Sequence, residues 1–192
     1  MFTGIITHLG KISSKRDGHL AVRTKKKFLV NLERGISVSI NGICLTVKRV
    51  QKGYFEIDFM PETENKTNLK HTKIGDLVNL ELPATPSSFL SGHILQGHID
   101  GVSKLMNIQT KGNSYILKFS ITDALARYLV SKGSIAINGI SLTVIEIGKN
   151  FFTVGIIPYT WVKTMLRKVK IGQFVNIEVD IMAKYLERLT KK

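Results

Sequence analysis

Hydrophobic and polar positions alternate in short stretches along the chain, and this pattern predicts β-strands. Residues 54–59 (YFEIDF) and 78–82 (VNLEL) alternate in the way expected of half-buried strands. Residues 37–40 and 45–47 are short β-rich runs joined through Asn41 and Gly42, a pair that readily adopts positive φ in a tight turn. Short strands separated by turn residues favour a small closed barrel.

Helical spacing is rarer. Residues 123–130 predict one short helix with Leu125 and Leu129 on one face, and residues 26–33 are a weaker counterpart. Asp180 precedes a final helical stretch and is either its N-cap or a pocket carboxylate. The apolar stripe of this last stretch consists of Ile181, Met182, Tyr185, Leu186 and Leu189. The stripe either contacts another chain or folds back on its own barrel, and the first is favoured because small barrels expose little groove.

The pattern of short predicted strands occurs twice in the chain. Residues 41–47 (NGICLTV) return 97 residues later as residues 138–144 (NGISLTV), with Cys44 and Ser141 as the only difference. The same spacing relates residues 73–81 to 170–178 and residues 60–63 to 157–160, and it would align residues 4–5 with 101–102. We infer the duplication of a domain, too long for a solenoid unit. The expected units are residues 1–97, 98–181 and a C-terminal helix at 182–192.

Composition places the chain among ordinary globular proteins. Of its 192 residues 43% are hydrophobic and 22% charged, with a mean hydropathy of +0.07. No apolar run approaches the roughly 18 residues of a membrane span, and the first eight residues do not resemble a signal peptide. Cys44 is the single cysteine, which excludes an internal disulfide and indicates a reducing, cytoplasmic setting.

The charge is strongly positive, with 28 Lys and Arg against 14 Asp and Glu and a net charge of +14. Such a balance can indicate a nucleic-acid or membrane partner. The lysines are scattered, however, and residues 25–27 form the one tight run. Neither zinc-finger spacing nor an aromatic RNA-binding signature is present. A solvated lysine-rich surface is therefore favoured, with no nucleic-acid or membrane partner.

Few residues offer obvious chemistry. The chain has no zinc-ligand cluster, phosphate loop or dinucleotide fingerprint, so no metal site is expected. His93 and His98 lie among glycines in residues 91–101 (SGHILQGHIDG), which hints at a backbone that approaches a ligand closely. Cys44 and Ser141 occupy equivalent positions and are either small core residues or parts of two specialised pockets. The polar loops at 58–63 and 157–162 could hold a polyol or be ordinary loops.

Four motifs together resemble the riboflavin synthase alpha-chain family: residues 1–6 (MFTGII), 41–47, 92–101 (GHILQGHIDG) and 138–144. The resemblance covers the chain from Met1 to the terminal helix. It implies an all-β fold of two tandem six-stranded antiparallel barrels, each a lumazine-binding domain, plus a C-terminal helix that gathers three chains into a homotrimer. It also implies an association with lumazine synthase and no metal or redox cofactor.

The activity that the resemblance implies is the transfer of a four-carbon unit between two molecules of 6,7-dimethyl-8-ribityllumazine, one bound by each barrel. The products are riboflavin and 5-amino-6-ribitylaminouracil. The active site would form where the N-terminal barrel of one subunit meets the C-terminal barrel of its neighbour. Such chemistry suits a chain with few reactive groups, because holding two reactants in orientation can lower a barrier by about 7–11 kcal/mol. One or two acid–base groups would add about 10²–10⁴-fold.

Site residues follow from the family by matched position. In the first barrel they are Gly4, Ile5, Ile6, Cys44, Leu45, Thr46, Asp58, Phe59, Met60, Pro61, Glu62 and Thr63. In the second they are Gly97, His98, Ile99, Lys132, Ser141, Leu142, Thr143, Ile157, Pro158, Tyr159, Thr160, Trp161 and Val162. The residues matched to the chemistry are Ser37, Cys44, His98, Ser141, Thr143 and Asp180.

The resemblance also suggests roles. His98 would shuttle protons, Asp180 would polarise the ring or a water together with Ser141 and Thr143, and Cys44 would line the partner ring. The chain departs from the family at residues 62–69 (ETENKTNL for the usual ETLRRTNL), at Trp161 for a usual leucine and at Met165 for a usual Thr or Asn.

Two rival functions remain. A non-catalytic lumazine or flavin carrier of the same fold would be expected to lose the Gly-His-Ile and Cys-Leu-Thr patterns, which stand here. A basic nucleic-acid-binding barrel would show steeply salt-dependent retention on nucleic acid.

Overall fold

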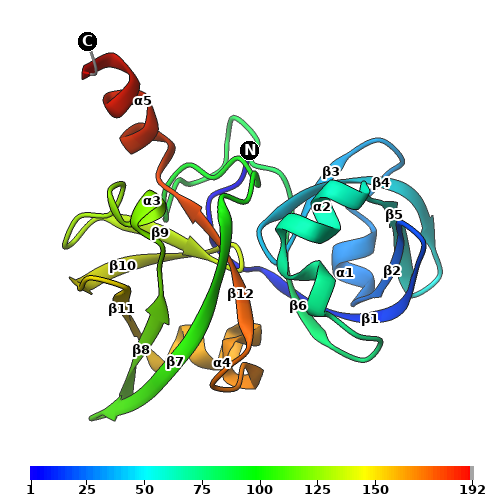
Figure 1. Ribbon diagram of the computed structural model, residues 1–192. Helices are drawn as coiled ribbons and strands as arrows, with labels where there is room; N and C mark the ends of the chain where they lie inside the picture. The colour runs from blue at the N-terminus through cyan, green and yellow to red at the C-terminus, as the bar shows by residue number, and fades with distance from the viewer. Residues whose placement is uncertain (191–192) are drawn as a thin grey trace.

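The computed structural model describes residues 1–190, which form two closed antiparallel barrels side by side and a C-terminal helix (Figure 1). The first barrel has the strand order β1-β2-β5-β4-β3-β6. Its strands are β1 (His8–Arg16), β2 (His19–Arg23), β3 (Ser37–Ile40), β4 (Ile43–Gln51), β5 (Tyr54–Asp58) and β6 (Leu77–Glu81). The second barrel repeats this order with β7 (Gly101–Lys111), β8 (Ser114–Ser120), β9 (Ser134–Ile137), β10 (Ile140–Ile147), β11 (Phe151–Ile156) and β12 (Phe174–Val179). The predicted fold is confirmed.

Short helices occupy equivalent places in the two barrels. They are α1 (Lys26–Leu29), α2 (Pro61–Lys66) and the 3-10 turn η1 (Asn68–His71) in the first, and α3 (Asp123–Ala126), α4 (Pro158–Lys163) and η2 (Met165–Lys168) in the second. The helix predicted at 123–130 is thus a single turn. The helix ends at Ala126, and the chain then reaches β9 through a turn in which Lys132 lies in the left-handed region at φ 66°. No helix among residues 1–190 is long and apolar enough to cross a bilayer.

Each barrel has its own core. Phe28 and Phe55 are fully buried in the first, and Phe119 and Phe152 stack with a centroid distance of 5.6 Å in the second. Closure of the strands leaves no exposed sheet edge, so the inward residues of every strand converge on one apolar centre. The two cores explain why the alternating pattern of the sequence recurs in both repeats.

The number of residues that separates equivalent positions of the two repeats is not constant along the chain. Equivalent pairs such as His19–Asp58 and Ile116–Gly155 keep the spacing of 97. At the first strand the spacing is 93 instead, because His8 pairs with Leu80 and Gly101 pairs with Ile177. The β7–β8 hairpin therefore carries four more residues than β1–β2. The expected match of residues 4–5 with 101–102 is wrong, and Gly4 corresponds to Gly97.

The two barrels meet at their equivalent β3–β4 and β9–β10 turns. Gly42 and Gly139, with φ of 81° and 76°, lie back to back, and a Cβ on Gly42 would sit 2.7 Å from the Gly139 nitrogen. No other residue type fits such a contact, because a Cβ atom essentially never approaches a backbone atom so closely. The pair marks a local two-fold relation between the repeats.

A buried asparagine network surrounds this contact. Asn79 Nδ2 donates to the Asn138 carbonyl at 2.9 Å, and its counterpart Asn176 Nδ2 donates to the Asn41 carbonyl at 2.8 Å. Asn68 adds a backbone N–H to Asn176 Oδ1 at 2.6 Å and a side-chain N–H to Asn138 Oδ1 at 3.1 Å. All five asparagines are at most 4% exposed. Buried polar groups must be paired, so the network fixes how the barrels dock.

The last helix, α5 (Ile181–Thr190), extends from the end of β12 (Figure 1). Asp180 is its N-cap, because Asp180 Oδ1 accepts the Met182 N–H at 3.0 Å. Polar contacts hold α5 to the second barrel, through Glu187 with Arg127 and through Lys184 with Asp100. The stripe members with the largest exposed fractions, 57–81%, are Met182, Tyr185, Leu186 and Leu189.

Candidate functional site

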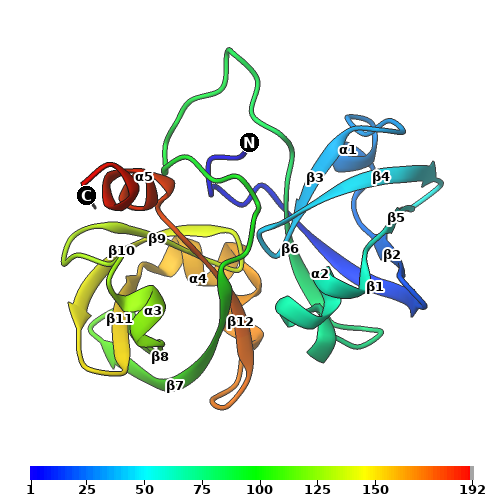
Figure 2. The ribbon, with the colours of Figure 1, turned by 45° about the horizontal axis from the view of Figure 1, so that its top comes forward.

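The segments that lead into the two barrels cross over. Phe2 and Leu95 exchange two backbone hydrogen bonds where the segments pass each other between the barrels (Figure 2). Beyond this point the Gly4 carbonyl accepts the N–H of Ser141 in the second barrel, and the Gly97 carbonyl accepts the N–H of Cys44 in the first, each at 2.9 Å. Residues 4–6 therefore lie on the second barrel and residues 97–99 on the first, the reverse of the expected assignment.

Close packing requires glycine at the crossing. Gly4 and Gly97 have φ of 79° and 80°. A Cβ at Gly97 would lie 2.5 Å from the Cys44 Cβ, and a Cβ at Gly4 would lie 2.6 Å from the Ser141 Cβ. Each glycine thus allows the next residue, Ile5 or His98, to reach the rim of the opposite barrel.

A cleft of about 220 Å³ opens at the first barrel between β4, α2 and the crossing segment. Its lining includes Cys44, Met60, Glu62, Thr63, Gly97, His98 and Ile99, all of them predicted site residues. Glu62 and Lys66 form an ion pair of 2.8 Å at its exposed rim. The volume lies below the usual range of about 300–1,000 Å³ for enclosed ligand pockets, so this cleft is small for an enclosed site.

A larger cleft, of about 750 Å³, lies between the N-terminal segment, the edge of the first barrel, the linker that follows β6 and helix α4 of the second barrel. It brings Ile5 and Ile6 together with Tyr159 and Lys163 of α4. Tyr159 stands at the position of Glu62, and Lys163 at that of Lys66. The two clefts therefore correspond at the crossing segment and at the short helix, whereas Ser141, the counterpart of Cys44, does not line the larger one.

Ser141 has a partner that its counterpart Cys44 lacks. Ser141 Oγ lies 2.7 Å from His93 Nδ1, whereas Cys44 packs in an apolar cluster with Phe2 and Leu95. Burial lowers the pKa of His93, an effect that the charge of nearby Asp180 partly offsets. His93 is therefore neutral near pH 7. Within residues 1–190 its Nε2 is buried without a hydrogen-bond partner. Ser141, His93 and Asp180 thus form one polar group at the second barrel.

Other predicted residues lie outside the clefts. The side chains of Leu45, Phe59 and Leu142 belong to the barrel cores. Asp58 is tied to His19 and Lys48 on the surface, and Trp161 stacks on Tyr115 with a centroid distance of 4.2 Å.

The remaining strand residues form outward-facing pairs. Ser37 pairs with Thr46, and Ser134 pairs with Thr143 at the equivalent place. Lys132 precedes this second pair, with its N–H bonded to the Val144 carbonyl.

Sequence reasoning missed two buried carboxylates beside the clefts. Glu81 is the last residue of β6 and Glu178 the last but one of β12; both are 4% exposed and accept hydrogen bonds from the crossing segments. Burial raises the pKa of Glu178 to about 7, and the nearby Asp100 adds to the rise. Burial also raises the pKa of Glu81. The recurrence of Glu at the end of both KIG-containing motifs is the signal that could have revealed them.

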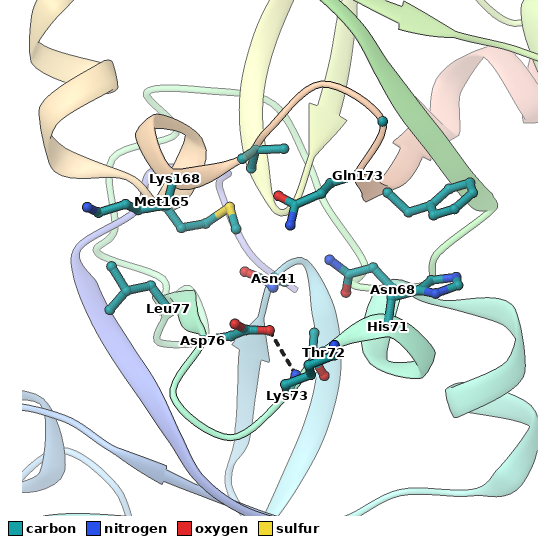
Figure 3. Close-up of a pocket in the computed structure, with 13 residues that line it drawn as sticks. Asn41, Asn68, His71, Thr72, Lys73, Asp76, Leu77, Met165, Lys168 and Gln173 are labelled. Carbon is teal, nitrogen blue, oxygen red and sulfur yellow. Dashed lines mark hydrogen bonds between the residues drawn. The ribbon is translucent and has the colours of Figure 1, made fainter.

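A third hollow, of about 400 Å³, lies between the barrels beside the asparagine network (Figure 3). Asn68, Gln173 and Met165 point into it, and the Asp76 carboxylate accepts the Lys73 N–H at 2.8 Å. Met165 occupies the position equivalent to Asn68 and offers its sulfur to Asn138 Nδ2 at 3.2 Å, which accommodates this departure from the family pattern. None of the predicted site residues lines this hollow.

No group of three or more His, Cys, Asp or Glu side chains within residues 1–190 is placed to hold a metal ion. The clefts offer instead backbone groups, hydroxyls and rim charges, which suit an organic ligand with polar edges.

Comparison with known families finds one match, the lumazine binding domain, at residues 3–83 and again at residues 96–180. The chain is 40% identical to the riboflavin synthase of Actinobacillus pleuropneumoniae and 38% identical to that of Bacillus subtilis (strain 168). Both alignments span 195 residues, all of this chain and 91% of each relative. The riboflavin synthase of Mycobacterium tuberculosis is 39% identical over 198 residues, which is all of this chain and 98% of the relative.

Two solved structures of LumP share the fold. One is complexed with 6,7-dimethyl-8-(1'-D-ribityl) lumazine, with a TM-score of 0.82 and 27% identity. The other is complexed with riboflavin, with a TM-score of 0.84 and 28% identity. Each comparison covers 93% of this chain and 99% of the LumP chain.

Proposed function

The chain belongs to the riboflavin synthase family, and we propose that each of its two clefts binds one 6,7-dimethyl-8-ribityllumazine for the reaction that this family catalyses. It is a transferase, which moves a four-carbon unit between two lumazines to give riboflavin and 5-amino-6-ribitylaminouracil. The observation that supports the two-cleft assignment is the equivalent crossing of the two segments, which brings residues 97–99 into the cleft of the first barrel and residues 5–6 beside α4 of the second.

The difference between the clefts supports unequal roles for two identical reactants. The first cleft has Cys44 in an apolar setting with His98 at its rim, whereas at the equivalent place on the second barrel Ser141 is hydrogen-bonded to His93. A hydroxyl with a fixed partner can polarise a ring nitrogen or carbonyl, whereas a thiol among apolar groups cannot do so as well. This asymmetry lets one lumazine donate the four-carbon unit and the other accept it.

Orientation supplies most of the rate enhancement in this proposal. Stacking two rings face to face removes the entropic cost of their encounter, which is worth about 7–11 kcal/mol. His98, exposed beside the first cleft, is placed to move protons during the transfer. Asp180, beside His93 and Ser141, contributes negative charge at the second site while it caps α5.

The productive site forms between two subunits of a homotrimer in this proposal. The first cleft, of about 220 Å³, is small for an enclosed site, which is consistent with a neighbouring chain that brings the second ring. The exposed stripe of α5 offers an apolar surface for such an assembly. An association with lumazine synthase would then bring the enzyme to the source of its substrate, and the single cysteine suits a cytoplasmic setting.

The first test is incubation of the purified chain with 6,7-dimethyl-8-ribityllumazine and measurement of riboflavin by absorbance and fluorescence. One mole of riboflavin per two moles of lumazine consumed is the expected result. Binding without turnover would point to a carrier instead.

The second test separates the two roles of Asp180. Asp180→Asn keeps a capping side chain and removes the charge, whereas Asp180→Ala removes both. If the charge matters, both variants slow turnover at saturating lumazine, and His98→Ala does so as well. An unchanged turnover number in Asp180→Asn or in His98→Ala would contradict the role assigned to that residue.

A further inference from the structure

Two glutamates occupy a setting that carboxylates rarely adopt. Glu81 and Glu178 stand at the same position in the last strand of each barrel, and each is 4% exposed. Carboxylates are almost never so buried unless they are paired. Neither forms one of the salt bridges found within residues 1–190, so an ion pair does not account for their burial.

Their partners are the crossing segments. Glu81 accepts the N–H and the hydroxyl of Thr3, both at 2.7 Å, and the Gly4 N–H at 3.1 Å. Glu178 accepts the Gln96 N–H at 2.7 Å and the Gly97 N–H at 3.1 Å. Hydrogen bonds to an ionised acceptor are roughly twice as strong as neutral ones. Each carboxylate therefore fixes two consecutive backbone amides in a segment that otherwise has little secondary structure.

Each held segment serves the other barrel. Glu178 accepts the N–H of Gly97, and the carbonyl of the same residue accepts the N–H of Cys44 in the first barrel. The next residue, His98, lies in the first cleft. In the same way Glu81 holds Gly4, whose carbonyl accepts the N–H of Ser141, and Ile5 follows in the second cleft, which Glu81 itself also lines. The contact therefore runs from a strand of one barrel, through two or three residues, to the cleft of the other.

We propose that Glu81 and Glu178 are a matched pair of positioning residues, each of which holds, from one barrel, the segment that completes the lumazine cleft of the other barrel. This inference rests on the proposed function, because it takes the two clefts to be the lumazine sites. It predicts that a substitution of Glu178, in the second barrel, alters lumazine binding at the first cleft. Likewise a substitution of Glu81 alters lumazine binding at the second cleft.

Replacement by glutamine is the sharpest perturbation. Glutamine keeps the shape but turns one acceptor oxygen into an NH2 donor, which then faces a backbone N–H donor. Glu178→Gln is expected to weaken lumazine binding at the first cleft about tenfold, in line with the loss of one charge-assisted bond. Glu178→Asp keeps the charge with a shorter reach and should restore part of the affinity. Glu146→Gln, at an exposed position on β10, is the matched control and should leave binding unchanged.

Double-mutant cycles identify which cleft each glutamate serves. Kinetic constants and lumazine affinities are measured for Glu178→Gln and Glu81→Gln, each combined with His98→Ala in the first cleft or Tyr159→Ala in the second. Glu178→Gln should be non-additive with His98→Ala and additive with Tyr159→Ala, and Glu81→Gln should show the opposite pattern. Additive effects in all four pairs, or coupling within the same barrel instead, would overturn the proposal.

A pH profile adds a readout that a merely structural role would not move. The ionised form of Glu178 accepts both amides, so lumazine affinity at the first cleft should rise as pH increases through about 7, the pKa of this carboxyl. The charged groups that face Glu178 are Asp100, ahead of β7, and Lys184 of α5. Glu178→Gln should flatten this rise, and Glu81→Gln should keep it. Loss of thermal stability with an unchanged affinity and pH profile would leave Glu178 a structural residue only.

The outcomes of the two proposals are distinguishable. Absence of riboflavin from the wild-type chain would contradict the catalytic function but would leave the binding cycles interpretable. Riboflavin formation with no coupling in the cycles would contradict the positioning role alone.

Discussion

Asn176 lies at the centre of the contact between the barrels, and its replacement by alanine tests whether the asparagine network holds them together. Asn176 is fully buried. Its Oδ1 accepts the Asn68 N–H at 2.6 Å, and its Nδ2 donates to the Asn41 carbonyl at 2.8 Å and to Asn68 Oδ1 at 2.9 Å. Alanine removes all three bonds and leaves a backbone N–H and a backbone carbonyl without partners.

The magnitude follows from these orphaned groups. Each buried backbone group left without a partner costs about 1–3 kcal/mol, so the two together should lower the free energy of unfolding by about 2–6 kcal/mol. That is a large share of the roughly 5–15 kcal/mol that stabilises a typical domain. With a urea dependence of about 2 kcal/mol per molar, the unfolding midpoint should fall by about 1–3 M.

The assay uses two probes of urea unfolding at one fixed protein concentration, because oligomer stability depends on concentration. Trp161 is the single tryptophan and stacks on Tyr115 in the second barrel, so its fluorescence reports that barrel. Far-ultraviolet circular dichroism reports both barrels. Asn107→Ala, at an exposed position on β7, is the control and should change stability by less than about 0.5 kcal/mol. A loss below about 1 kcal/mol in Asn176→Ala would show that water replaces the missing bonds, and would refute the reasoning.

Three further outcomes are expected. Leu189→Asp places a charge in the exposed apolar stripe of α5, so size-exclusion chromatography with light scattering should show monomers of 21.5 kDa. The control variant Arg188→Asp should leave the assembly intact. An unchanged mass for Leu189→Asp would contradict the trimer contact. The pKa of Glu178 is about 7 in the folded protein and near the ordinary value of 4.5 in the unfolded chain. The contribution of this residue to stability is therefore present below about pH 4.5 and is lost as pH rises through about 7. Urea midpoints at pH 5 and pH 8 should therefore differ less in Glu178→Gln than in the wild type, and an equal difference would speak against the raised pKa. His93→Ala removes the hydrogen-bond partner of Ser141 Oγ and should lower the turnover number about tenfold, while lumazine affinity at the first cleft stays constant. A tenfold loss of lumazine affinity at the first cleft would indicate general disruption of the fold instead.

Much of the fold follows from the sequence because its causes are local. The Asn41-Gly42 turn appears with the expected positive φ, and the alternation in residues 54–59 and 78–82 becomes β5 and β6. The duplication follows from the recurrence of these local patterns. Each of them can be recognised in a window of fewer than ten residues.

The rest depends on contacts between distant residues. A single repeat spacing conceals the four extra residues of the β7–β8 hairpin, because the hairpin sequences themselves have diverged. The crossing of the two leading segments is set by bonds such as Thr3 to Glu81, which lie 78 residues apart. Glu81 looks like the solvent-facing member of an alternating strand, and it is buried only because the crossing segment covers it.

The contact between Gly42 and Gly139 also bears on how the two halves of the gene can evolve. Duplicate copies are ordinarily free to drift apart, since each substitution affects one copy alone. Here the side chain of any residue that replaced one glycine would clash with the backbone of the other, so the effect of a mutation in one copy depends on the sequence of both copies. Divergence is therefore channelled away from this axis, toward places such as the hairpin tips, where the copies already differ in length.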